Sequence, residues 1–163
     1  MDGSGNVLDV DRIEEDLKNF MIVVAAVIER DDRRILIGQR RRGDTSPLKW
    51  EFPGGKIEGD EEPEVALARE LREELGATLV RWVEMGRVEL VYAGVANPVE
   101  IRFYAAEIAD ENIQPKCFEQ IAWVLPRELR DYDFLDANRV LIAQLATGKV
   151  KPAELLRNAK TSE

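Results

Sequence analysis

Three glutamates in one predicted helix are the side chains best suited to chemistry in this chain of 163 residues. Residues 62–75 are rich in Ala, Leu, Glu and Arg, which predicts a helix, and Gly76 supplies its C-terminal stop. On that helix Glu70, Glu73 and Glu74 share one arc beside an apolar stripe. Carboxylates at this spacing repel one another unless a cation compensates for their charge, so the arc is either a cation site or a solvated helix face.

The three glutamates belong to a longer ordered pattern between Gly55 and Ala77. Five residues separate Gly55 from Glu61, seven more lead to Arg69, and Arg-Glu-Leu-Arg-Glu-Glu-Leu-Gly-Ala follows from there. The pattern resembles the Nudix box, in which Gly, Glu, Arg-Glu, Glu-Glu and Gly stand at these spacings. Ala77 is the one departure, because a larger aliphatic residue is usual there, and it concerns local packing rather than chemistry.

The resemblance implies metal-dependent phosphate chemistry, since Nudix enzymes hydrolyse a diphosphate linked to another moiety. Mg²⁺, with Mn²⁺ as the alternative, prefers oxygen ligands. By resemblance, Glu70, Glu73 and Glu74 are expected to bind the metal and to act in catalysis, and the carbonyl of Gly54 adds a further ligand. By resemblance, the remaining box positions have structural roles: Gly55, Glu61, Arg69 and Gly76. Arg69 is expected to pair with a box carboxylate.

The general base must be a carboxylate, because the chain contains no histidine. In the Nudix family this base is a glutamate of the box helix or one from a later loop. Glu119 stands where such loop acids occur, and its alternative interpretation is a solvated loop charge. Both assignments stay open at the level of sequence.

Residues 48–58 sharpen the resemblance to the MutT-like subgroup, which cleaves nucleoside triphosphates to monophosphates. Arg40 matches the place of a phosphate-contacting arginine in that subgroup, with Arg41 and Arg42 as its neighbours, and a solvated basic loop is the alternative. Asn138 resembles an asparagine that contacts the purine, and it suits the start of a helix equally well. Phe52 either forms a wall of the base pocket or packs in the core.

We therefore expect Mg²⁺-dependent hydrolysis of a nucleoside triphosphate to monophosphate and pyrophosphate. By resemblance, oxidised purine nucleotides such as 8-oxo-dGTP are the leading substrates, and their removal from the nucleotide pool is the role. CTP or ADP-ribose is the alternative within the enzyme class. A nucleotide-binding Nudix module without turnover is the alternative outside it.

Several short elements must position these residues. The predicted strands span residues 20–28, 34–37, 83–92, 99–108 and 121–125, a helical turn follows at 127–131, and a terminal helix covers 138–146. The first two strands flank a charged turn and the next two flank residues 94–98, so each pair predicts a hairpin. This order, in which strands cluster, favours an α+β fold, an α/β/α sandwich with a mixed sheet between helices, as in the Nudix fold.

Length and composition predict one domain. At about 150 residues per domain, the chain divides into an N-terminal extension (1–18), a Nudix domain (19–148) and a polar C-terminal tail (149–163). A hydrophobic content of 45% excludes a disordered chain. Cys117, the only cysteine, predicts a buried apolar side chain and a reducing cytosol, and Trp50, Trp82 and Trp123 are assigned to the core.

The net charge of −9 excludes nucleic-acid polymers and anionic membranes as partners. The longest apolar run, residues 20–28, is about half of what a membrane crossing needs. We expect a cytoplasmic protein, monomeric or homodimeric, whose partner is a small nucleotide substrate. A bound cation is then needed to bring that anionic ligand to an acidic protein.

Overall fold

The computed structural model describes residues 21–91, 98–109 and 112–159, so the predicted extension at 1–18 lies outside the described residues. Its elements run in the order β1 (Met21–Ile28), β2 (Ile35–Gln39), β3 (Trp50–Glu51), β4 (Gly54–Lys56), α2 (Pro63–Leu75), β5 (Leu79–Leu90), β6 (Val99–Ile108), β7 (Gln120–Val124), η1 (Pro126–Asp131), η2 (Asp136–Asn138), α3 (Arg139–Ala146) and α4 (Pro152–Asn158). The predicted box helix and terminal helix are therefore confirmed to within one residue.

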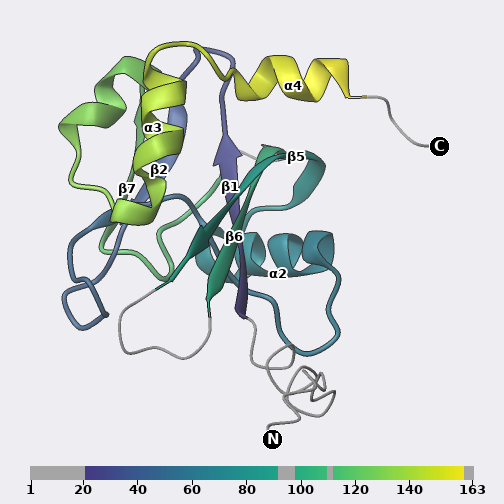
Figure 1. Cartoon of the computed structure of the whole chain (residues 1–163), viewed down its shortest axis with the longest axis vertical. Coiled ribbons are helices and arrows are strands. Elements are labelled where there is room, and N and C mark those ends of the chain that lie inside the picture. Colours follow the sequence, from purple (N-terminus) through teal and green to yellow (C-terminus); the bar gives the residue numbers. More distant parts are fainter. Residues whose placement is uncertain (1–20, 92–97, 110–111, 160–163) are drawn as a thin grey trace, which may run out of the picture.

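The strands form two sheets, one ordered β4-β1-β6-β5 and the other β3-β2-β7 (Figure 1). Strands β1 and β6 are parallel and the remaining pairs are antiparallel, which confirms a mixed arrangement. The second predicted hairpin is confirmed as β5 and β6. The first is wrong, because β1 and β2 lie in different sheets and only the bridge between Glu29 and Ile35 joins their ends.

Strand β1 occupies the middle of the molecule. Both of its edges are taken, by β4 and by β6, which is why β2 cannot pair along it. Val24, Ala26 and Ile28 face one core, which the apolar side of α2 completes, while Ala25 and Val27 face a second core beneath α3. The continuous apolar run thus becomes a strand buried on both faces, with α2 and α3 on opposite sides of it (Figure 1).

Helix α2 begins and ends for local reasons. Pro63 occupies the first turn, where its missing N–H costs nothing, and Gly76 ends the helix with a φ of 67°. Leu67, Leu71 and Leu75 are fully buried against the sheet. This packing fixes the rotation of α2 about its axis, and so the direction in which its glutamates point.

Three predictions about structure rather than chemistry are corrected. The polar segment after residue 149 forms α4, which packs on β5 and β6 through the buried Pro152 and Leu156. Trp82 is 44% exposed, because alternate residues of β5 face away from the core. Cys117 is exposed in a loop rather than buried. The limits of the domain at residues 19 and 148 stay a prediction.

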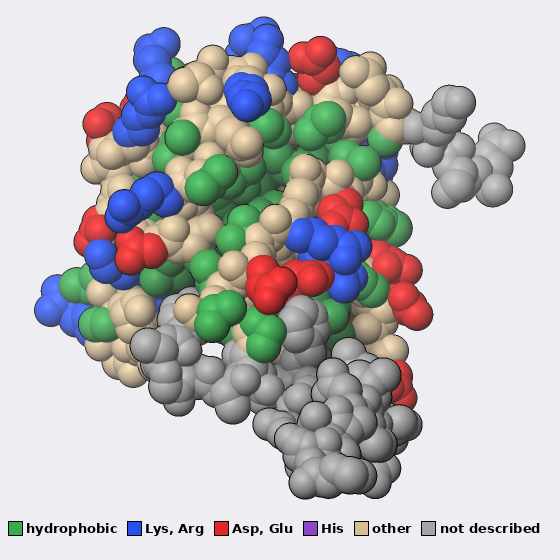
Figure 2. Space-filling model, in the orientation of Figure 1, with side chains coloured by type: hydrophobic (Ala, Val, Ile, Leu, Met, Phe, Trp, Pro, Cys, Tyr) green, Lys and Arg blue, Asp and Glu red, His purple; other side chains and the backbone are tan. Residues whose placement is uncertain are grey.

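The surface in Figure 2 carries hydrophobic side chains in the hollow middle of this face, with cationic and anionic side chains interspersed around them. The negative net charge is therefore not gathered into one acidic patch on this side. Among the described residues, no helix has the length and apolar character that a membrane crossing needs.

Candidate active site

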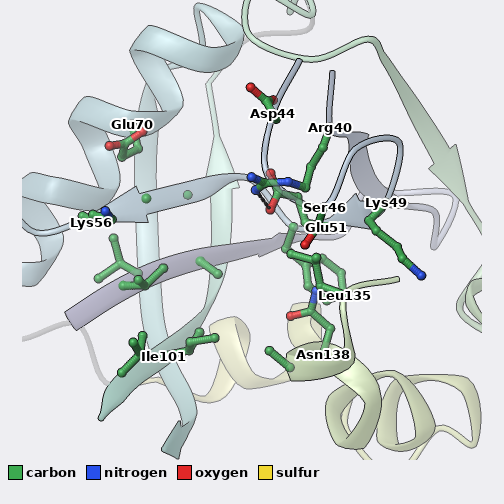
Figure 3. A pocket seen from close by; sticks show the side chains of 18 of the residues that line it. Arg40, Asp44, Ser46, Lys49, Glu51, Lys56, Glu70, Ile101, Leu135 and Asn138 are labelled. Carbon is green, nitrogen blue, oxygen red and sulfur yellow. Dashed lines mark hydrogen bonds and ion pairs between the residues drawn. The ribbon is translucent and has the colours of Figure 1, made fainter. Parts of the chain in front are cut away.

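A cavity of about 780 Å³ lies beside β4 and the carboxyl-terminal half of α2 (Figure 3). Its size is that of a small-molecule site. Seven of the predicted site residues, which come from distant parts of the chain, line this cavity: Arg40, Phe52, Gly54, Gly55, Glu70, Glu74 and Asn138. Glu73 and Glu119 are not among its lining residues. The structure thus brings most of the predicted site together and leaves two of its glutamates outside.

The glycine pair of β4 allows α2 to approach the strand closely. A Cβ atom on Gly55 would lie 2.4 Å from Cδ of Glu70, so the carboxylate of Glu70 rests directly on this glycine. A Cβ on Gly54 would lie 1.9 Å from the carbonyl oxygen of Val24, within the pairing of β1 and β4. Any side chain at these positions would displace either the carboxylate or the strand.

Glu70 and Glu74 stand one helical turn apart and face the cavity as a carboxyl pair. Burial, together with the hydrogen bond and the negative charge of Glu70, raises the pKa of Glu74 to about 9. The N–H of Gly54 donates weakly to the same carboxylate, at 3.4 Å. Two acids held this close need a proton or a cation between them.

Arg69 holds the outer side of this carboxylate group. Its Nε and Nη2 donate to the two oxygens of Glu61 at 2.8 and 2.9 Å, and its Nη1 donates to Glu70 at 2.9 Å. The hydrogen bond from Arg69 lowers the pKa of Glu61. Glu73 also reaches Nη1, at 3.4 Å, but its side chain is 58% exposed. Arg69 therefore orients Glu70 and draws Glu73 away from the cavity.

Two of the three predicted glutamates are placed where they could bind a hard divalent cation. Within the described ranges, no three Asp, Glu, His or Cys side chains are grouped closely enough to hold a metal ion by themselves. Mg²⁺, however, is commonly held by one or two carboxylates, with water and substrate phosphate completing the shell. Glu70 and Glu74, beside the backbone of Gly54, match that requirement, whereas a three-glutamate cage is not assembled here.

Glu51 is a cavity residue that the sequence reasoning missed. The pairing of β2 with β3 sets Gly38 opposite Glu51. Arg40, two residues after Gly38, then lies within reach of the Glu51 side chain. Nη1 of Arg40 donates to Glu51 at 3.1 Å, and burial raises the pKa of Glu51. The only sequence signal was its position between two apolar residues, Trp50 and Phe52.

Asn138 lies where the start of α3 borders the cavity (Figure 3), and Phe52 also lines this cavity. Asn138 is only 5% exposed and precedes α3, yet its side chain makes no capping hydrogen bond. The structure therefore does not support the capping interpretation, and Asn138 lines the cavity. Phe52 is buried and packs edge-on to the ring of Phe103, which confirms its place in the core. It also lines the cavity, and its role beside a base stays a prediction.

Glu119 lies in an exposed loop, where its backbone N–H donates to the carbonyl oxygen of Gln39 at 2.9 Å. Its neighbours Cys117 and Phe118 line the cavity, but Glu119 does not. The structure therefore places this glutamate near the site without bringing it in.

Comparisons with known proteins agree with this geometry. The NUDIX domain family model matches residues 19–158. A CTP pyrophosphohydrolase of Escherichia coli (strain K12) is 36% identical over 137 residues, 81% of this chain and 96% of that protein. An 8-oxo-dGTP diphosphatase of the same organism is 32% identical over 129 residues, 79% of this chain and 98% of the relative. A solved MutT structure, from a study of the Aliivibrio salmonicida and Vibrio cholerae proteins, superposes with a TM-score of 0.66 at 28% identity, covering 80% of this chain and 99% of that one.

Proposed function

This chain belongs to the Nudix hydrolase family, and from that premise we propose that it hydrolyses nucleoside triphosphates to nucleoside monophosphate and pyrophosphate with Mg²⁺. The observation that carries the proposal is a cavity that joins the buried amide of Asn138 to a carboxyl pair. Figure 3 shows Asn138 and Glu70 at different ends of that cavity, with Arg40 also directed into it. A nucleotide has its base and its phosphates at two ends in the same way.

The amide of Asn138 is suited to the base, because it can both donate and accept a hydrogen bond. Phe52 supplies an apolar wall beside it. The guanidinium of Arg40 is suited to a phosphate group, for which its planar fork is a good match.

Hydrolysis requires that water attack one of the two phosphorus atoms on either side of the α,β-bridging oxygen. The bond from that phosphorus to the bridging oxygen breaks, and the leaving phosphate gains charge. Bound Mg²⁺ would neutralise the phosphates and stabilise the charge on the leaving oxygen. Glu70 and Glu74 would hold the ion, and a carboxylate of the box helix would orient or deprotonate the water, since the chain has no histidine. Glu119 is the less favoured base, because it lies outside the cavity.

Oxidised purine triphosphates such as 8-oxo-dGTP are the proposed substrates, and the cytoplasmic nucleotide pool is the proposed setting. The second candidate is CTP, which the similarity to the CTP pyrophosphohydrolase favours. An amide of the Asn138 type can pair with an edge of either base, so the two substrates must be separated by experiment.

The test is pyrophosphate release from 8-oxo-dGTP, dGTP and CTP, and AMP release from ADP-ribose, at equal concentration, with Mg²⁺ and with EDTA. We expect release that depends on Mg²⁺, with 8-oxo-dGTP or CTP giving the highest kcat/KM. Glu70→Gln is the variant compared with the unchanged protein, because it keeps the size of the side chain and removes its charge. Release that is unchanged by EDTA, or equal in Glu70→Gln, contradicts the proposal.

A further inference from the structure

The ion pair between Arg40 and Glu51 stands inside the cavity, where its chemistry conflicts with binding an anion. Both side chains line the cavity and are partly buried, with 22% and 24% of their side-chain surface exposed. Glu51 is therefore a fourth carboxylate in a space that already contains Asp44, Glu70 and Glu74. Each added negative charge weakens the binding of a phosphate there, so its presence requires an explanation.

The hydrogen bonds of Arg40 supply that explanation. Its Nε donates to the carbonyl oxygen of Thr45 at 2.6 Å, and its Nη2 donates to Oγ1 of the same residue at 2.8 Å. Its Nη1 donates to Glu51 at 3.1 Å. These bonds use three of the five N–H groups of a guanidinium and leave one on each Nη. The planar group is thus fixed on two sides, and its remaining pair of donors can still meet a phosphate.

We propose that Glu51 is a positioning residue that orients Arg40 and, by neutralising part of its charge, weakens the hold of the site on the monophosphate product. This inference rests on the proposed function, because it takes the phosphate-contacting role of Arg40 as given. Thr45 comes from a loop, whereas Glu51 comes from β3, whose pairing with β2 is fixed. Glu51 therefore anchors Arg40 to the sheet.

The inference predicts the effect of removing only the charge. In Glu51→Gln the amide oxygen can still accept from Arg40, but the guanidinium is no longer neutralised. The affinity for a nucleoside monophosphate should rise about three- to tenfold, a range suited to a pair that is neither fully exposed nor fully buried. A nucleoside, which lacks the phosphate, should bind Glu51→Gln and the unchanged protein equally.

The experiment measures dissociation constants for dGMP and CMP, and for deoxyguanosine and cytidine, with the full chain at low ionic strength. Binding of these compounds needs no turnover, so the result is independent of whether pyrophosphate is released. Glu84→Gln is the matched control, since Glu84 pairs with Arg87 outside the cavity. Thermal melting of every variant confirms that the compared proteins are folded.

A double-mutant cycle separates the proposed role from simple repulsion. In an Arg40→Met background, Glu51→Gln should change the dGMP and CMP affinities by less than about twofold, because the charge that Glu51 neutralises is gone. Equal tightening in that background would show general repulsion and would overturn the inference. So would unchanged monophosphate affinity in Glu51→Gln, or a nucleoside affinity that changes as much as the monophosphate affinity does.

Discussion

Alanine at either glycine of β4 should damage this protein in two different ways, although the residues are adjacent. In Gly54→Ala the new Cβ would lie 1.9 Å from the carbonyl oxygen of Val24, about 1 Å closer than the 3.0 Å below which real Cβ atoms are essentially never found. That oxygen belongs to the backbone of the central strand, so β4 must move away from β1. In Gly55→Ala the clash, at 2.4 Å, is with the carboxylate of Glu70, which can turn aside.

The expected magnitudes follow from what has to move. Separating β4 from β1 combines overpacking with lost strand hydrogen bonds, so Gly54→Ala should cost about 3 kcal/mol or more. For a chain of this size that lowers the melting temperature by roughly 6–12 °C. Gly55→Ala should cost about 1 kcal/mol, since only a side chain rotates, but it removes Glu70 from the cavity and should lower kcat/KM at least about a hundredfold.

Thermal melting by circular dichroism and pyrophosphate release with Mg²⁺ measure the two effects separately. Gly86→Ala is the control, because a Cβ there meets nothing within 4 Å and the residue lies outside the cavity. Equal melting temperatures for Gly54→Ala and Gly55→Ala would refute the clash argument. Full activity in Gly55→Ala would refute the placement of Glu70 in the active site.

Three further substitutions test the rest of the site. Glu61→Gln should lower the melting temperature above pH 5, and by progressively less as the pH falls. Arg69 lowers the pKa of Glu61 below 4.5, so the stabilisation from the Glu61 carboxylate is present above its ordinary pKa and is lost as the pH falls through the lowered pKa. A difference in melting temperature that does not vary with pH would contradict this. Asn138→Ala should raise KM for the preferred nucleotide about 10- to 100-fold in steady-state assays, with little change in melting temperature because no cap is lost. Glu73→Gln should lower kcat about 10²- to 10³-fold with unchanged melting, since Glu73 is the exposed carboxylate of the box helix that is not assigned to the metal and would serve the attacking water. Equal turnover would remove Glu73 from the catalytic set.

The sequence was most informative where structure is determined locally. The helix that became α2 could be predicted because its composition, Pro63 and Gly76 all act within one segment. Gly55, Glu61 and Arg69 could be assigned because their fixed spacing reflects direct contacts between β4, the following loop and α2. In these cases the interacting partners are close in the chain.

Features that depend on competition between distant segments could not be predicted. Whether β2 pairs with β1 depends on β4 and β6 taking both edges of β1 first. The exposure of Trp82 depends on which face of β5 is covered, and Arg81, its neighbour, donates to the carbonyl oxygen of Leu156 in α4 on the opposite face. The role of Glu51 depends on the register between two strands.

The arrangement of arginines explains how an acidic chain can still be selective for an anion. Arg69 is the cation nearest to the box carboxylates, but Glu61 and Glu70 occupy its donors, and it stands on the outer side of α2. Arg40 is inside the cavity, but Glu51 neutralises part of its charge. Neither arginine therefore gives the cavity a strong positive field of its own. Lys49 and Lys56 also line the cavity. A phosphate would gain further where a cation lies between Glu70 and Glu74, which would link its binding to the place where the proposed chemistry can occur.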